Sequence, residues 1–296
     1  MIKKRVIYYL IYLKKIQLNK LLRGEIMKIR MSEEQIKKTL LDILLEFADF
    51  CDRNNLKYYL SGGTMLGAIR HNGFIPWDDD VDVLMPRPDY EKLMVKWKEN
   101  PLKNRYRLAT RKNGLSSFPF AKIYDLSTEV VGKYTSADKN LWIDIFPMDG
   151  VPEDEKQCKR HLEKARRIKG WMNYSMTCSL ETSSFWKKIV KIPAVFIARL
   201  VGTDNWAKQL EQLGKMYNFE ESRYAAGVLW SCGARERMEK EKYLPIVEVE
   251  FEGKKFHAPQ CWDEYLKAMY GDYMKLPPQN SRKYHLIEVY KISEGE

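Results

Sequence analysis

The sequence has little of what builds a disulfide framework or a zinc cluster. It holds 5 cysteines and 4 histidines among 296 residues, and the cysteines are widely scattered without a C-x-x-C pair. An odd number of dispersed cysteines argues against both kinds of cross-link. We therefore expect reduced thiols and a cytoplasmic protein, in which an isolated histidine is more often structural than a metal ligand.

Long apolar runs are absent as well, since none approaches the roughly 20 residues that a transmembrane helix needs. The basic start at Met1–Arg5 and the apolar stretch after it imitate a signal peptide, but Lys14 and Lys15 interrupt it and no small-residue cleavage site follows. This pattern argues against secretion. Internal repeats and low-complexity tracts are also missing, and the hydrophobic and charged fractions are ordinary for a globular protein.

Negative charge is scarce at the start of the chain. Residues 1–30 contain nine Lys and Arg against the single acidic Glu25, a net charge of +8 out of +11 for the whole chain. The other residues are nearly balanced, so we expect no nucleic-acid partner. This leader is also rich in Ile, Leu and Tyr, which is typical of an amphipathic helix on an anionic membrane surface. We expect it to hold the protein peripherally at the inner face of the membrane, with a solvated tail or a packed helix as the alternative.

One short stretch concentrates carboxylates. Asp78, Asp80 and Asp82 occupy every other position, between the apolar residues 74–77 and 83–85. Successive side chains of a strand alternate between its faces, so these three would share a face and Asp79 would lie on the other. Like charges this close repel each other unless a cation lies among them. Oxygen ligands suit Mg²⁺, with Mn²⁺ as the alternative.

Two other interpretations of the aspartates are weaker. A run of aspartates often forms a solvated turn, but the apolar flanks place this one at the edge of a core. The spacing also matches the first ligands of an EF-hand calcium loop. That loop requires Gly at its sixth position and Glu at its twelfth, whereas this chain has Val83 and Asp89.

A glycine pair precedes the aspartates. Gly62, Gly63 and Thr64 follow the apolar run 56–60, and residues 64–71 suit a short helix. Glycines allow a tight turn whose backbone approaches a phosphate closely, and the helix N-terminus attracts an anion. An ordinary strand-to-helix turn is the alternative. Together with the aspartates, the turn predicts metal-assisted transfer of a phosphorus-containing group.

Further polar candidates lie outside this stretch. Asp144 lies between two isoleucines in a predicted strand, where it can complete the metal site or take the proton from an acceptor hydroxyl. Capping of the next turn is its structural alternative. Arg70, His71 and Lys122 are candidate contacts for a diphosphate, because the transition state carries spread negative charge. Lys122 is flanked by apolar residues in a predicted strand, an unusual place for a solvated lysine.

Four aromatic residues could stack on a base or enclose a quaternary ammonium group through cation–π attraction. Packing in the core is the simpler interpretation of each. They are Trp77, Trp142, Tyr124 and Trp230.

The order of the expected elements predicts an α+β fold with a mixed sheet flanked by helices. Short strands dominate the catalytic core at 56–146, with the last one, 141–146, closed by Pro147. Residues 151–296 add a helical insertion and a C-terminal cover, including a helix at 183–200 that Pro193 should kink or break and a strand at 227–230. Residues 31–296 are thus expected to form one extended domain.

The continuous run 62–82, from the glycine pair to Asp82, resembles the signature of the LicD family. That family includes bacterial phosphocholine transferases and is related to fukutin and fukutin-related protein. Weaker similarity extends to 141–147 and 270–278, so it covers roughly residues 35–280. The resemblance implies a nucleotidyltransferase-like fold, in which an Asp-x-Asp pair, matched best by Asp80 and Asp82, binds the cation.

The resemblance also implies a substrate. The expected reaction moves a phosphorylated alcohol, most simply phosphocholine from CDP-choline, onto a hydroxyl of a cell-surface glycan such as lipopolysaccharide or teichoic acid, or onto its lipid-linked precursor, and releases CMP. Two alternatives stay open. The enzyme could be a nucleotidylyltransferase that places the nucleotide itself on the acceptor, or the chain could be a non-catalytic protein that binds a membrane surface.

Overall fold

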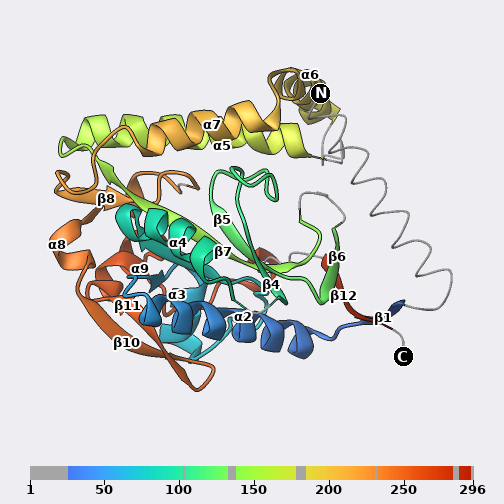
Figure 1. Ribbon diagram of the computed structural model, residues 1–296. Coiled ribbons are helices and arrows are strands. Elements are labelled where there is room, and N and C mark those ends of the chain that lie inside the picture. The colour runs from blue at the N-terminus through green and yellow to red at the C-terminus, as the bar shows by residue number, and fades with distance from the viewer. Residues whose placement is uncertain are drawn as a thin grey trace.

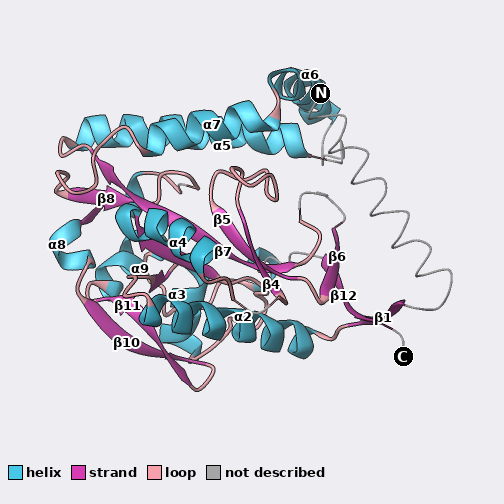
Figure 2. Ribbon diagram, viewed as in Figure 1, coloured by secondary structure: helices cyan, strands magenta, loops and turns pink. Residues whose placement is uncertain are grey.

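The computed structural model describes residues 26–102, 104–132, 138–177, 185–230, 232–282 and 287–294. A central mixed sheet forms the middle of the molecule, in the order β2-β3-β7-β5-β4 (Figures 1 and 2). Only β3 and β7 run parallel along this path; the other pairs are antiparallel. These strands are β2 (Tyr59–Leu60), β3 (Asp82–Pro86), β4 (Tyr106–Ala109), β5 (Ala121–Asp125) and β7 (Leu141–Val151). The predicted α+β class is confirmed.

Helices cover the sheet on both sides. The helix α2 (Glu33–Arg53) begins with a capping box, in which Ser32 and Gln35 exchange hydrogen bonds. Its apolar face is buried against the sheet, on the side opposite the helical arm formed by α5, α6 and α7 (Figure 1). The other helices are α3 (Gly62–His71), α4 (Arg87–Glu99), α5 (Glu155–Met176), α6 (Phe185–Val201), α7 (Thr203–Gly214), α8 (Lys240–Tyr243) and α9 (Trp262–Tyr270).

Smaller elements surround this core. A three-stranded sheet joins the two ends of the described chain in the order β1-β12-β6, and the hairpin β10–β11 turns at Gly253. A pair of short strands, β8 and β9, extends the far end of β7. The elements are β1 (Ile26–Arg30), β6 (Thr128–Gly132), β8 (Tyr224–Ala226), β9 (Met238–Glu239), β10 (Ile246–Phe251), β11 (Lys254–Pro259) and β12 (Ile287–Glu294), with the 3₁₀ turns η1 (Ala234–Glu236) and η2 (Gln279–Ser281).

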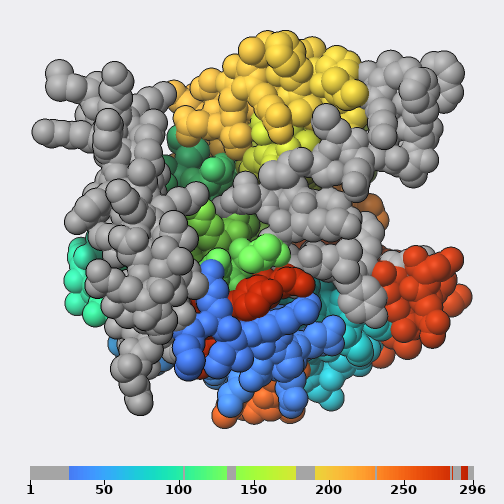
Figure 3. All heavy atoms as spheres, turned by 90° about the vertical axis from the view of Figure 1, so that its right-hand side faces the viewer, coloured from blue at the N-terminus to red at the C-terminus, as the bar shows by residue number. Residues whose placement is uncertain are grey.

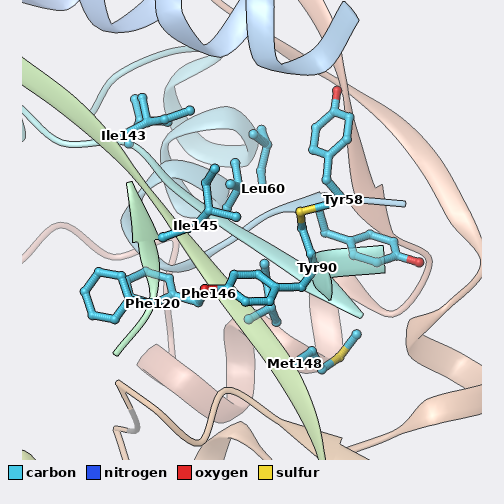
Figure 4. Close-up of a cluster of buried hydrophobic side chains, with 14 of the residues drawn as sticks. Tyr58, Leu60, Tyr90, Phe120, Ile143, Ile145, Phe146 and Met148 are labelled. Atoms are coloured by element: carbon cyan, nitrogen blue, oxygen red, sulfur yellow. The ribbon is translucent and has the colours of Figure 1, made fainter. Parts of the chain in front are cut away.

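The core beneath the sheet is built from strand and helix residues that lie far apart in the sequence. Figure 4 shows side chains from β2, β7 and α4 packed together with Phe120, which directly precedes β5. Ile143 and Ile145 are fully buried, which confirms that this part of β7 has its apolar side chains in the core. The polar residue between them, Asp144, therefore points away from the core and toward the site described below.

Four expectations about local structure are wrong. Pro147 does not end β7: at that point β7 pairs with β3 alone, because β5 pairs only as far as Ile145, and proline is tolerated where one side of a strand lacks a partner. Pro193 does not break α6, which continues through it, and the expected kink stays a prediction. Residues 227–230 form a turn rather than a strand, since the strand there is β8 just before them. Residues 26–30 of the predicted leader form β1, while 1–25 lie outside the described residues.

In the part of the chain that the structure describes, every helix is too short or too polar to cross a bilayer.

Candidate active site

The glycine pair begins α3 and lies directly against two of the predicted carboxylates. Gly62 has a φ of +54°, a conformation that other residues rarely adopt. A Cβ at Gly62 would lie 3.2 Å from Oδ2 of Asp82, and one at Gly63 would lie 2.6 Å from Oδ2 of Asp78. A side chain at Gly63 would collide with that carboxylate. The two glycines thus let Asp78 and Asp82 reach the first turn of α3.

The backbone of Asp82 is fixed by the residues next to this turn. Its N–H donates to Oγ1 of Thr64 at 2.8 Å, and its carbonyl accepts from the N–H of Ser61 at 3.0 Å. The buried hydroxyl of Thr64 therefore positions the start of β3. Its predicted contact with a phosphate stays a prediction.

Asp82 and Asp144 are neighbours across the sheet. They are opposite each other in the parallel pairing of β3 and β7, and the N–H of Asp144 donates to the carbonyl of Val81 at 2.9 Å. Burial raises the pKa of Asp82 well above its usual value, and the charges of Asp80, Asp144 and Asp78 raise it further. Four carboxylates therefore act on one region at the N-terminus of α3.

The path of the chain into β3 differs from the expected one. The strand starts only at Asp82, and the residues before it form a turn closed by the N–H of Asp78 and the carbonyl of Ile75, 2.9 Å apart. Alternation along a strand therefore does not explain how Asp78 and Asp80 face Asp82. The turn and the glycine pair bring them there. Asp79, which was expected to lie on the other face, and its neighbour Asp78 both line a cavity that Arg30 and Trp77 also line.

Lys122 is buried against Asp144. The two residues are opposite each other in the pairing of β5 and β7, and Nζ lies 3.0 Å from Oδ1 of Asp144 and 3.1 Å from Oδ2 of Asp138. The lysine is only 2% exposed, and Tyr124 donates from its hydroxyl to Asp138 at 2.6 Å. Lys122 thus supplies an internal positive charge between two carboxylates. Its predicted contact with a diphosphate stays a prediction.

The predicted aromatic residues contact protein groups. The ammonium of Lys122 lies 4.3 Å from the ring centre of Trp142, and the guanidinium of Arg282 lies 4.3 Å from that of Trp77. Trp230 packs edge-on against Phe120, with ring centres 5.2 Å apart. These contacts agree with packing as the simpler interpretation of these side chains.

The electrostatics of Asp144 suit a proton acceptor. Burial raises the pKa of its carboxyl, while Lys122 opposes that rise and Asp138 adds to it. A carboxylate with a raised pKa binds a proton more readily than a solvated one, and the charge of Lys122 offsets part of that rise.

Arg70 and His71 lie at the opposite end of α3. Eight residues separate Gly62 from Arg70, which corresponds to about 12 Å along a helix axis. Arg70 donates from Nε to Nε2 of His71 at 3.0 Å and from Nη1 to the carbonyl of Tyr273 at 2.7 Å. Burial lowers the pKa of His71, and the neighbouring Arg70 lowers it further. The pair is tied to the C-terminal cover, and its predicted phosphate contact stays untested.

Two tyrosines of α9 that the sequence pattern does not indicate also lie at the glycine turn. The hydroxyl of Tyr265 lies 3.2 Å from Oγ of Ser61 and accepts from the N–H of Gly62, also at 3.2 Å. The hydroxyl of Tyr270 would lie 3.9 Å from a Cβ at Gly62. Burial raises the pKa of Tyr270, and Tyr265, Asp82 and Asp78 add to the rise. The similarity at 270–278 covers Tyr270, but only the folded chain shows that it meets the glycine turn.

The donor set fits a hard divalent cation. Asp78, Asp80 and Asp82 offer only oxygen ligands, and a bound cation would relieve the repulsion that raises the pKa of Asp82. Among the described residues, no three acidic, histidine or cysteine side chains stand close enough to enclose a metal ion as they are arranged. Metal binding therefore requires these side chains to rotate toward each other.

Comparison with known proteins gives the family. A profile described as "LicD/FKTN/FKRP, nucleotidyltransferase domain" matches residues 55–195. The lipopolysaccharide cholinephosphotransferase LicD of Haemophilus influenzae is 33% identical over 273 residues, which cover 89% of this chain and 98% of that protein. This chain belongs to the LicD family. The family match confirms the predicted resemblance and the prediction of an enzyme that transfers phosphate-containing groups.

Two shorter matches concern proteins without a described function. The uncharacterized protein RP689 of Rickettsia prowazekii is 36% identical over 72 residues, 21% of this chain and 27% of that protein. The uncharacterized protein RT0683 of Rickettsia typhi is 30% identical over 79 residues, 26% of this chain and 25% of that protein. They add no information on the substrate of this LicD-family chain.

Proposed function

We propose that this protein is a metal-dependent transferase that moves phosphocholine from CDP-choline to a hydroxyl of lipopolysaccharide, or of a lipid-linked glycan precursor, and releases CMP. The observation that carries the proposal is the match over nearly the full length of a relative named as a lipopolysaccharide cholinephosphotransferase. The carboxylates around the first turn of α3 support it, because they fit a cation-bound diphosphate.

Each group has a distinct part in this proposal. Asp78, Asp80 and Asp82 would hold Mg²⁺, or Mn²⁺ in its place, and the ion supplies positive charge to the diphosphate as the bond to CMP breaks. Asp144 takes the proton of the acceptor hydroxyl at its carboxylate. Lys122 holds Asp144 in place and sets its charge. Burial of this side of the site keeps water away from the reacting groups.

The nucleotidylyltransferase alternative has one observation in its favour. The matching profile is described as a nucleotidyltransferase domain, and both reactions attack a phosphorus atom of a polyphosphate. The products separate them, since phosphocholine transfer releases CMP, whereas nucleotidylyl transfer from a nucleoside triphosphate releases pyrophosphate. A non-catalytic binding protein would have no use for the carboxylates gathered around Gly62 and Gly63.

The decisive experiment offers the purified protein a panel of CDP-alcohols with lipopolysaccharide as the acceptor. CMP release that needs both CDP-choline and a divalent cation, and that stops with a chelator, is the expected result. Asp144→Asn should lower turnover more than it weakens nucleotide binding, because a base acts in the transition state. Release of pyrophosphate from CTP with a nucleotide adduct on the acceptor would instead favour the alternative.

A further inference from the structure

The helix α6 exposes a continuous apolar face. Ile192, Phe196, Ile197 and Leu200 are between 48% and 71% exposed. At 100° per residue these four side chains fall within an arc of about 140°, which places them on one side of a helix. Single exposed apolar residues are normal, but four large ones on one helical face mark an interaction surface.

The orientation of this face is fixed by the rest of the helical arm. Val195 and Ala198 on the other side of α6 are buried, at 3% and 0% exposed. Trp206 on α7 donates from Nε1 to the carbonyl of Ala198 at 3.0 Å, and Arg199 donates from Nη2 to the carbonyl of Thr177 at 2.8 Å. The helix is therefore held against α5 and α7 with its apolar side outward. Figures 1 and 3 show it at the edge of the molecule, beyond the sheet.

The charges on α6 all have the same sign. The segment Phe185–Val201 contains Lys187, Lys188, Lys191 and Arg199 and no acidic residue. A helix that exposes large apolar side chains on one face and whose charged residues are all basic suits an anionic lipid surface, which offers both an apolar interior and negative headgroups. A protein partner would need an apolar patch ringed by acidic groups to match it.

We propose that α6 docks this protein on an anionic membrane surface, with Ile192, Phe196, Ile197 and Leu200 entering the boundary between headgroups and acyl chains. The helix lies in the plane of the membrane. Its 17 residues span about 26 Å, less than the roughly 30 Å of a bilayer core, and it carries basic residues along its length. The proposal does not rest on the transfer reaction, and it is separate from any contribution of residues 1–25.

The first test uses the full chain with two substitutions on this face. Phe196→Glu combined with Leu200→Glu should lower the partition coefficient onto vesicles of phosphatidylglycerol and phosphatidylcholine by roughly tenfold or more, because it removes apolar area and adds repulsive charge. The matched control is Val95→Glu with Met216→Glu, at residues that are 55% and 57% exposed elsewhere. Vesicle sedimentation at low and high salt gives the measurement. Equal sedimentation of the two double variants would overturn the proposal.

A second measurement covers the case in which the charged variant is misfolded. Phe196→Cys in a Cys232→Ser background carries an environment-sensitive fluorophore, and its emission should shift to the blue when anionic vesicles are added. A label at Val95→Cys should not shift. Blue-shifted emission without vesicles that is lost on dilution would assign the face to a second copy of this chain. Blue-shifted emission without vesicles that is unchanged at every dilution would mean that another part of the same chain covers the apolar face of α6. Either result overturns membrane docking.

Discussion

The central sheet buries charged side chains, whereas the helical arm exposes large apolar ones, and both arrangements are unusual in a folded protein. In the sheet, charged groups are inside: Lys122 lies between two carboxylates, and Asp149 is 1% exposed with Arg87 bound to both of its oxygens. In the arm, large apolar groups such as Phe196 and Leu200 are outside. Burying charge and exposing apolar surface both cost free energy, so each departure marks a place where the fold serves something other than its own stability.

The comparison also separates two kinds of recognition. The sheet gathers half-buried carboxylates around the first turn of α3, an arrangement that suits a small charged ligand. The arm presents a broad exposed apolar face, which suits a surface. An enzyme that modifies a lipid-linked glycan would need both, one for the chemistry and one for the place where the acceptor is found.

The largest expected effect tests the sheet. Asp82→Asn should lower turnover by roughly a hundredfold or more, because it removes an anionic ligand from the centre of the proposed metal site. Without metal the same variant should gain stability, since it relieves the repulsion that raises the pKa of Asp82. CMP release and thermal unfolding with a chelator measure the two effects. Asp79→Asn is the matched control, and equal damage from it would remove the special role of Asp82.

The internal lysine gives the next largest effect. Lys122→Met leaves Asp138 and Asp144 buried without their cation, and breaking such a pair costs about 3–5 kcal/mol of unfolding free energy. Adding Asp138→Asn should recover part of this loss, because one of the two uncompensated charges is then gone. Urea unfolding of both variants checks the prediction. A loss below about 1 kcal/mol for Lys122→Met is the size expected of an exposed pair and would contradict the buried charge described here.

The sequence predicts those features of this arrangement that depend on residues close together in the chain. The capping box at Ser32, the turn at Gly253 and the helix after Gly63 follow from residues a few positions apart, and all three are present. The pairing of Asp82 with Asp144, and of Asp144 with Lys122, depends on which strands become neighbours across the sheet. Local periodicity contains no information on that choice. It could show only that Lys122 was an unusual residue for a buried strand.

A carboxylate in the 3₁₀ turn η1 makes the stability of the folded protein sensitive to pH. Burial raises the pKa of Glu236 to about 7, and the N–H of Cys232 opposes that rise by donating to the carboxylate. The folded protein therefore binds this proton more tightly than the unfolded chain, for which the pKa is 4.5. The stabilisation is complete below pH 4.5 and is lost as the pH rises to about 7.

The test compares wild type with Glu236→Gln at pH 4.5 and pH 8. Relative to wild type, the variant should gain up to about 3 kcal/mol of unfolding free energy between the two pH values, because its amide has no proton to lose. Denaturant unfolding measures the difference. A constant difference across this range would mean that the pKa of Glu236 is the same in the folded and the unfolded chain, so that its burial has no cost that depends on pH.

The smallest expected effect distinguishes the two tyrosines of α9. Tyr270→Phe should lower kcat/KM by roughly three- to tenfold with little change in stability, because the hydroxyl beside the glycine turn is lost while the ring stays. Tyr265→Phe should instead lower the unfolding free energy by about 1–3 kcal/mol, since it leaves the N–H of Gly62 without its acceptor. Steady-state kinetics and urea unfolding of both variants give the comparison. If Tyr270→Phe loses stability and keeps its activity, then the Tyr270 hydroxyl stabilises the packing of the C-terminal cover. Tyr270 would then not be part of the active site, which would consist of the carboxylates and the glycine turn.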